Sequence, residues 1–475
     1  MPLPKPTRGI GSLAMTELWE RFSFYGLQGI LAFYLLYTLQ EGGLGLGAAA
    51  AASIVGAYGG AVYLAQIFGA WMGDRVLAPK RLVFWGGVVI TLGHLALAFI
   101  PGAAGLGLGL GLIVVGTGAL KTNITSIVGF LLDSNQSKRD AGFSYFYMAI
   151  NIGAVAGPLA TGIAQSMVGF HLGFGLAAVG MMAALIQYAV GMRNLPEQAS
   201  IVRNPLLRSK AWVPLLVVAV LAGVIIMAWS TRILNSGNMA NATTLVIVGA
   251  SVAYLAIMLS SKVVTPVEKT RLRGFIPLFI VSALYFGFLF QNFTTIAIII
   301  TERVDLHLGS WEFPAAWVTT MGPLAAVLAT PLLAKSWSRK GNRQPNAAAK
   351  ISFGMIQIGL GYVFLLIVSM LSGESIPLIL MLVFMVIVGV SEVLVGPIGL
   401  SLATRIAPSM YKSQLVALIF FALAAGSSLS GLLGQIYAAM NHEAYLGMIA
   451  VIAIVLGLAL RAFTQKINAA IGAGL

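Results

Sequence analysis

The sequence contains no cysteine, and only 14 acidic residues and 4 histidines occur among its 475 residues. The absence of cysteine excludes disulfide bonds, thiolate catalysis and cysteine-ligated metals. Charged residues make up 9% of the chain, whereas they make up about a quarter of a soluble globular protein. Together with 59% hydrophobic residues and a mean hydropathy of +0.94, this composition indicates a membrane protein with many spans.

Catalytic motifs are also missing from the sequence. It contains no HExxH, no GxSxG and no pair of histidines within an apolar run. An intramembrane enzyme would have to be built from Glu17, Glu20 and Glu392 alone, so we expect neither enzymatic activity nor a cofactor. No stretch resembles the selectivity filter of a channel.

Apolar runs long enough to cross a bilayer, about 20 residues each, recur along the whole chain. We predict an all-α membrane protein with 14 transmembrane helices. Their expected ranges are 12–38, 46–74, 82–101, 106–131, 141–167, 171–192, 212–233, 241–261, 274–300, 314–335, 350–371, 376–404, 412–438 and 444–465.

Most of the 28 lysines and arginines fall in alternate loops between these runs, which explains the net charge of +14 as topology. The opposite loops hold only Arg232 and Arg303, and Arg21 and Lys121 lie within spans. We therefore expect a multi-pass protein of the bacterial inner membrane with both termini in the cytoplasm, and no nucleic-acid partner. The basic residues that predict this orientation include Lys5, Arg8, Arg75, Lys138, Arg139, Arg208, Lys210, Arg343 and Lys466.

Two basic linkers, 193–211 and 262–273, enclose one pair of helices and divide the other twelve into six plus six. We predict an N-terminal six-helix bundle (1–192), a linker with two extra helices (193–273) and a C-terminal six-helix bundle (274–475). Two related bundles are the arrangement in which secondary transporters place a binding site near mid-membrane.

Three ionisable residues, Glu17, Glu20 and Arg21, lie within the first apolar run. Burying such charges in a bilayer is costly, so they normally face a cavity or a partner. Glu17 and Arg21 are four residues apart on one helix face and can pair, while Glu20 points about 100° away. A buried structural ion pair is the plainer interpretation, but three such groups within five residues favour a functional site.

Only two further charges are expected deep in the membrane, Lys121 and Glu392. The anion for Lys121 would be Glu17, Glu20 or a carboxylate of the substrate. Glu392 has no basic residue near it in its half of the membrane interior. Its carboxylate would therefore be protonated, because desolvation disfavours the charged form, or would bind a cation on the substrate; the structural alternative is a hydrogen bond at a helix broken near Pro397. Cations in the N-terminal half and an anion in the C-terminal half would suit a zwitterion.

Several motifs, in order along most of the chain, together resemble the proton-coupled oligopeptide transporter family of the major facilitator superfamily. Residues 17–26 (ELWERFSFYG) resemble its first-helix motif ExxERFxYYG, and residues 146–153 (FYMAINIG) resemble its fifth-helix signature. The remaining similar motifs are Gly69–Arg75, Gly116–Asn123 and Glu392 with Pro397. The resemblance implies the major facilitator fold of two six-helix bundles, and the inserted helix pair is similar to that of prokaryotic members.

The resemblance also implies roles for individual residues. Arg21 and Lys121 would hold the substrate carboxylate in a pocket lined by Tyr25, Tyr63 and Asn151. Glu392 would hold the amino terminus. Proton coupling would involve Glu17 and Glu20 together with Arg21 and Lys121.

The sequence departs from the family pattern in its C-terminal half, within the stretch that includes Phe286, Phe290 and Gln291. The family usually has tryptophan at Phe286 and glutamate at Phe290, and that glutamate is a partner of the fourth-helix lysine. We therefore expect a more apolar pocket wall here, with Phe286, Phe290 and Gln291 as substrate-facing positions, and a different anion for Lys121.

The leading hypothesis is a monomeric transporter that uses protons to carry di- and tripeptides or similar small zwitterions across the bilayer by alternating access. The alternative is an exporter or carrier of a peptide-like secondary metabolite or organic anion, with altered proton coupling. The missing carboxylate at Phe290 favours this alternative.

Overall fold

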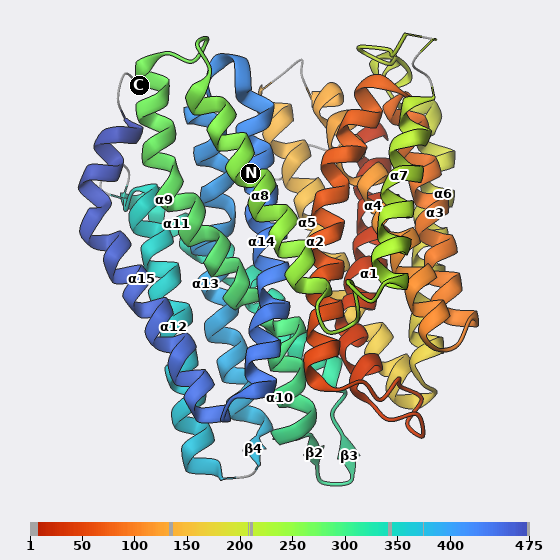
Figure 1. Cartoon of the computed structure of the whole chain (residues 1–475), viewed down its shortest axis with the longest axis vertical. Helices are drawn as coiled ribbons and strands as arrows, with labels where there is room; N and C mark the ends of the chain where they lie inside the picture. The colour runs from red at the N-terminus through yellow and green to blue at the C-terminus, as the bar shows by residue number, and fades with distance from the viewer. Residues whose placement is uncertain are drawn as a thin grey trace. The chain divides into compact units, whose positions relative to one another are not determined.

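The computed structural model describes residues 8–132, 136–207, 209, 212–340, 344–373 and 375–472, and almost all of them are helical (Figure 1). Of the basic residues used for topology, Lys5, Arg208, Lys210 and Arg343 lie outside these ranges. The side chains of Phe146 and Tyr147 are likewise outside what is described.

The α-helices are α1 (Arg8–Leu36), α2 (Ala48–Arg75), α3 (Pro79–Phe99), α4 (Gly102–Leu132), α5 (Gln136–Met167), α6 (Phe170–Gly191), α7 (Val213–Ser230), α8 (Met239–Ser260), α9 (Pro266–Leu289), α10 (Thr295–Arg303), α11 (Ala315–Lys340), α12 (Ala347–Ser372), α13 (Leu378–Ile406), α14 (Lys412–Ala439) and α15 (His442–Ile471). Short 3₁₀ turns are η1 (Met192–Asn194), η2 (Glu197–Ser200), η4 (Phe290–Phe293) and η6 (Ser409–Tyr411).

Each predicted span corresponds to a helix within a few residues, with one correction. The run 274–300, expected as a single helix, is divided into α9 and α10 by the 3₁₀ turn η4, and Thr294 after it has φ −127° and ψ −95°. Among the described residues, twelve segments are long and apolar enough to cross a membrane, one of which is Pro266–Arg303. The other two predicted spans are α1, which carries the buried charges, and the shorter apolar α7.

The helices form two compact units. The first comprises residues 1–46 and 61–236, and the second comprises residues 47–60 and 237–475. The inserted pair is shared between them, because α7 belongs to the first unit and α8 to the second. The three-part division at 192 and 273 stays a prediction.

Glycines allow the helices of the first unit to approach closely. A Cβ at Gly118 of α4 would lie 2.5 Å from the carbonyl oxygen of Ala65 on α2. A Cβ at Gly116 would lie 2.6 Å from the carbonyl oxygen of Gly86 on α3. These contacts fix α4, and with it Lys121, against two neighbours at distances that no other residue permits.

The described strands are very short and belong to the second unit. Strands β2 (His307–Leu308) and β3 (Trp311–Glu312) pair antiparallel, and β1 (Val304–Asp305) pairs parallel with β4 (Ile376–Pro377) (Figure 1). The hairpin between β2 and β3 turns at Gly309, whose φ of +67° favours glycine.

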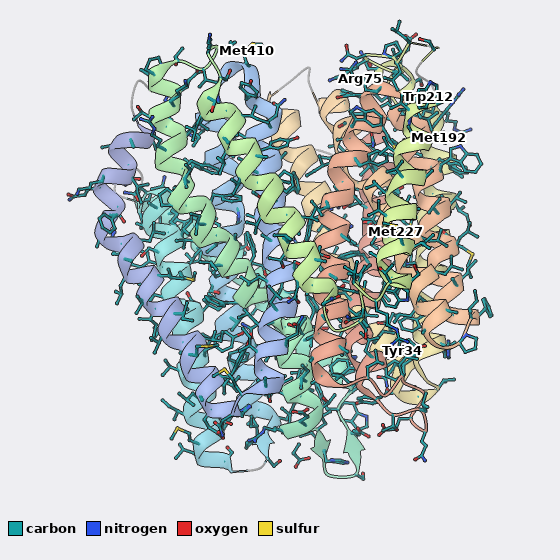
Figure 2. All side chains as sticks on the ribbon, in the orientation of Figure 1. Tyr34, Arg75, Met192, Trp212, Met227 and Met410 are labelled. Atoms are coloured by element: carbon teal, nitrogen blue, oxygen red, sulfur yellow. The ribbon has the colours of Figure 1, made fainter. Side chains whose placement is uncertain are left out.

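Helix α7 carries apolar side chains that remain exposed along its whole length, such as Trp212 just before it and Met227 near its end (Figure 2). Val224, Ile225 and Ile226 are more than half exposed as well. Such a helix suits contact with lipid, where exposed apolar surface carries no penalty.

Candidate functional site

The charged residues of α1 lie where α5 packs closely against it. A Cβ at Gly153 of α5 would lie 2.8 Å from the Cβ of Arg21, so only glycine fits there. About two turns further along α5, Thr161 donates a hydrogen bond of 2.9 Å to the carbonyl oxygen of Gly26. The fifth-helix signature therefore has a physical role, because its glycine brings α5 against the charged face of α1.

Arg21 is held by its sequence neighbour. Its Nε and one terminal nitrogen donate bonds of 2.5 and 2.6 Å to the two carboxylate oxygens of Glu20, and both side chains are buried. Its guanidinium also lies over the ring of Phe24, 4.6 Å from the centroid. The expected pair with Glu17 is present but looser, at 3.6 Å, because the planar guanidinium matches the bidentate geometry that Glu20 offers.

Glu17 forms an ion pair with Lys121 of α4. The Glu17 side chain is fully buried, and that of Lys121 is 18% exposed. Of the three anions considered for Lys121, the structure thus selects Glu17. Two carboxylates and two cations now form one cluster without net charge, in which each cation already has an anion.

The structure places the other predicted residues of the first unit near this cluster or on its helices. Tyr25 and Tyr63 both lie within electrostatic range of Arg21, and Tyr25 stacks edge-on against Phe24. Asn151 is half-buried on α5, two residues before Gly153. Asn123 has a structural role, because its amide donates to the carbonyl oxygen of Gly69 on α2 at 3.0 Å.

Glu392 lies in the second unit, on α13, and is half-buried. Among the described residues, no lysine, arginine or histidine lies within 4.0 Å of its carboxylate. The next residue back, Ser391, shares a 2.7 Å hydrogen bond with Tyr285 of α9, which also lies within electrostatic range of Glu392. The carboxylate therefore has polar neighbours but no countercharge from this part of the chain.

Phe286, Phe290 and Gln291 lie at the break between α9 and α10. The rings of Phe286 and Phe290 stack, with centroids 5.9 Å apart and planes 22° apart. Gln291 is fully buried and accepts a 2.6 Å hydrogen bond from Tyr445 of α15. Its side-chain oxygen is thus occupied within the second unit, which favours a structural role for this predicted binding residue.

Sequence reasoning missed the residues that stabilise this break. Asn292 donates to the carbonyl oxygen of Thr319 at 2.9 Å, and Thr294 donates to that of Ser430 at 3.1 Å. The signal was the polar run Gln291–Thr295 inside an otherwise apolar segment, since such groups satisfy the backbone where a helix is interrupted.

Two further features of the first unit have structural roles. His94 is fully buried and its Nε2 is 2.8 Å from the hydroxyl of Ser23, which itself donates to the carbonyl oxygen of Ala177. At the end of α2, the carbonyl oxygens of Asp74 and Arg75 accept hydrogen bonds from the backbone nitrogens of Asn204 and Leu206, so this helix end holds the linker that follows α6. Among the described residues, no three histidines or carboxylates gather in a way that would hold a metal.

A profile of one protein family, "PTR2: POT family", matches residues 80–451. The chain belongs to the POT family. A "Di-/tripeptide transporter" from Lactococcus lactis subsp. cremoris is 35% identical over 95% of this chain and 94% of its own length. An "Uncharacterized transporter YclF" from Bacillus subtilis is 36% identical over 95% of this chain and 92% of its own length.

Solved structures agree with this membership. The chain superimposes on the crystal structure of a peptide transporter POT in complex with sulfate with a TM-score of 0.93 and 36% identity, over 98% of this chain and 95% of the other. This POT protein thus has the major facilitator fold, with both predicted bundles and the additional pair, and it is a multi-pass membrane transporter and not an enzyme.

Proposed function

We propose that this POT protein is a proton-coupled transporter of di- and tripeptides, or similar small zwitterions, that works as a monomer by alternating access in the bacterial inner membrane. The observation that carries the proposal is the neutral cluster on α1 and α4. Both cations that would bind a carboxylate are already paired, Arg21 with Glu20 and Lys121 with Glu17.

A paired cation has little attraction left for a further anion. A substrate carboxylate therefore competes with the glutamates for Arg21 and Lys121. Protonation of Glu17 or Glu20 removes that competitor, because a neutral carboxyl group no longer compensates the cation. Proton binding and carboxylate binding then favour each other, and a coupling of this kind is reciprocal.

The amino terminus of the substrate is assigned to Glu392. This carboxylate has no countercharge among the described residues, so a substrate ammonium would supply the missing cation. A substrate that offers both a carboxylate to Arg21 and Lys121 and an ammonium group to Glu392 would then be preferred, so zwitterions would bind better than simple acids.

The test is uptake of labelled dialanine into proteoliposomes, with and without an inward proton gradient. The gradient should drive accumulation in the native protein. Glu17→Gln mimics a permanently protonated carboxyl group, so it should abolish accumulation and preserve exchange of dialanine between the two sides without a gradient. Glu443→Gln makes the same chemical change at the start of α15, in a half-exposed pair with Arg303 at 3.8 Å, and should transport normally.

A second candidate function is export of a peptide-like metabolite or organic anion. The stacked pair of Phe286 and Phe290 favours it, because it presents aromatic surface where the family usually has a tryptophan and a glutamate. Absence of dialanine transport by a folded, reconstituted protein would contradict the first proposal and support this one.

A further inference from the structure

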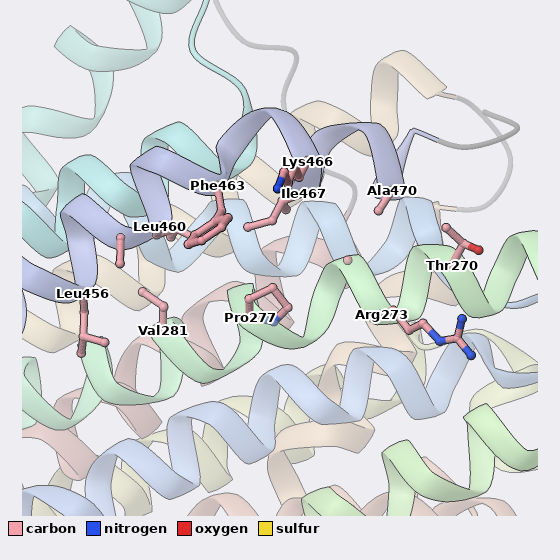
Figure 3. A pocket seen from close by; sticks show the side chains of 12 residues that line it. Thr270, Arg273, Pro277, Val281, Leu456, Leu460, Phe463, Lys466, Ile467 and Ala470 are labelled. Carbon is pink, nitrogen blue, oxygen red and sulfur yellow. The ribbon is translucent and has the colours of Figure 1, made fainter.

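A groove of about 450 Å³ lies between α9 and α15 in the second unit, away from the residues assigned to transport (Figure 3). The two helices run antiparallel, so the first turns of α9 meet the last turns of α15. The two helices approach closely at one end of the groove, where a Cβ at Gly274 would be 2.9 Å from the Cβ of Ala470.

The chemistry of the groove changes along its length. The polar residues of its lining are Thr270 and Arg273 of α9 and Lys466 of α15. Pro277, Val281, Leu456, Leu460 and Phe463 line the remainder. Figure 3 shows Thr270, Arg273 and Ala470 toward one end of the groove and Val281 and Leu456 toward the other.

The two cations have no carboxylate partner in this part of the chain. Among the described residues, no ion pair includes Arg273 or Lys466, and both side chains are exposed. Lys466 lies only over the ring of Phe463, 5.8 Å from its centroid. The acidic residue in the first turn of α9, Glu268, is engaged in a capping box with Thr265.

We propose that this groove binds one anionic phospholipid, with the phosphate at Arg273 and Lys466 and one acyl chain along Pro277, Val281 and Phe463. A soluble phosphate would contact the two cations but would leave the apolar wall of the groove without a partner. From Arg273 to Val281 the wall extends about 12 Å at the helical rise, enough for the upper half of an acyl chain.

The predicted topology agrees with this occupant. This end of α9 and α15 carries the basic residues that the alternation of loop charges places at the cytoplasmic surface. Anionic lipids of the cytoplasmic leaflet attract juxtamembrane lysine and arginine. The inference concerns a surface of the second unit and holds whichever substrate the protein transports.

The experiment measures lipid binding to the delipidated full chain by native mass spectrometry, with phosphatidylglycerol and phosphatidylcholine of identical chains as probes. We expect one tightly retained phosphatidylglycerol and no such retention of phosphatidylcholine. Each of the two cations at the bound phosphate should contribute about fivefold, the figure for a cation at an anionic lipid surface, so R273Q with K466Q should weaken phosphatidylglycerol by about 30-fold. The matched control, K262Q with R461Q, removes the same charge from this end outside the groove and should change binding less than twofold.

Two further arms separate a lipid site from a phosphate site. Ala459→Trp fills the apolar part and should weaken phosphatidylglycerol although both cations remain, whereas Leu458→Trp on the exposed side of the same helix should not. An excess of glycerol 3-phosphate should fail to displace the lipid. Equal binding of the two lipids, equal losses in the two double variants, or displacement by glycerol 3-phosphate would each overturn the proposal.

Discussion

At the scale of single residues, the pairing of Lys121 with Glu17 changes how the lysine contributes to stability. From the sequence, Lys121 is an amine whose anion could be Glu17, Glu20 or a carboxylate of the substrate. In the structure it compensates a fully buried carboxylate. Removing one member of such a pair leaves the other charge buried, which is usually more destabilising than removing both.

We therefore predict strongly non-additive effects of Lys121→Met and Glu17→Gln on stability. Each single change should cost roughly 3 to 5 kcal/mol, with Lys121→Met nearer the lower figure because Arg21 lies 3.6 Å from Glu17. The double variant should be more stable than either single variant. Thermal unfolding of the purified proteins in detergent measures this, and losses that simply add would show that the two side chains act independently.

A second prediction at this scale concerns Glu392. Since its carboxylate lacks a countercharge among the described residues, Glu392→Gln should reduce transport of dialanine by about tenfold or more, as loss of a charged hydrogen bond does. Transport of N-acetylated dialanine, which has no ammonium group, should be low in the native protein and unchanged in the variant. The same proteoliposome assay measures both, and equal loss for the two substrates would remove the amino-terminus assignment.

The sequence predicts that Glu17, Glu20, Arg21 and Lys121 can form ion pairs within the membrane, but not which of them pair. Spacing on one helix indicates that Glu17 and Arg21 are neighbours, and that contact exists at 3.6 Å. The tight partner of Arg21 is Glu20, and Lys121 comes from α4, more than 90 residues away in sequence. Pairing depends on side-chain torsions and on which helices pack together, and neither follows from helical periodicity.

At the scale of elements, hydrophobic runs predicted the helices well, because each span must be about 20 apolar residues long. The break between α9 and α10 was missed for the same reason. Its polar residues are too few to lower the apolar character of the run, yet Asn292 and Thr294 bind backbone carbonyls of other helices across it. Such compensation is visible only after the helices are packed.

Two glycines of α4, one packed against another helix and one in open space, should respond differently to substitution by alanine. Gly118→Ala would place a Cβ 2.5 Å from the carbonyl oxygen of Ala65, and backbone cannot move aside as a side chain can. We expect a loss of about 1 to 3 kcal/mol, or separation of α4 from α2. Gly107→Ala on the same helix meets nothing within 4 Å and should be neutral or slightly stabilising. Thermal unfolding compares the two, and similar effects would show that close packing at Gly118 contributes nothing.

At the scale of the whole molecule, composition alone identified the membrane protein, and several weak motifs in order identified the POT family. The division of the inserted pair was not foreseen, since α7 and α8 have similar apolar sequences. Only their contacts separate them: Thr244 of α8 shares a 2.7 Å hydrogen bond with Ser428 of α14, whereas α7 belongs to the other unit.

The orientation of the molecule is the last prediction, and the absence of cysteine makes it directly measurable because a single introduced thiol has no background. Ser310 lies in the exposed turn between β2 and β3, in a connection whose only basic residue apart from His307 is Arg303, and Ser200 lies exposed in the basic linker after α6. Since lysine and arginine are retained on the cytoplasmic side, Ser310→Cys should react with a membrane-impermeant maleimide in intact cells, and Ser200→Cys only after the cells are opened. The reverse pattern would place the basic loops outside, and it would also move the α9–α15 groove away from the cytoplasmic leaflet.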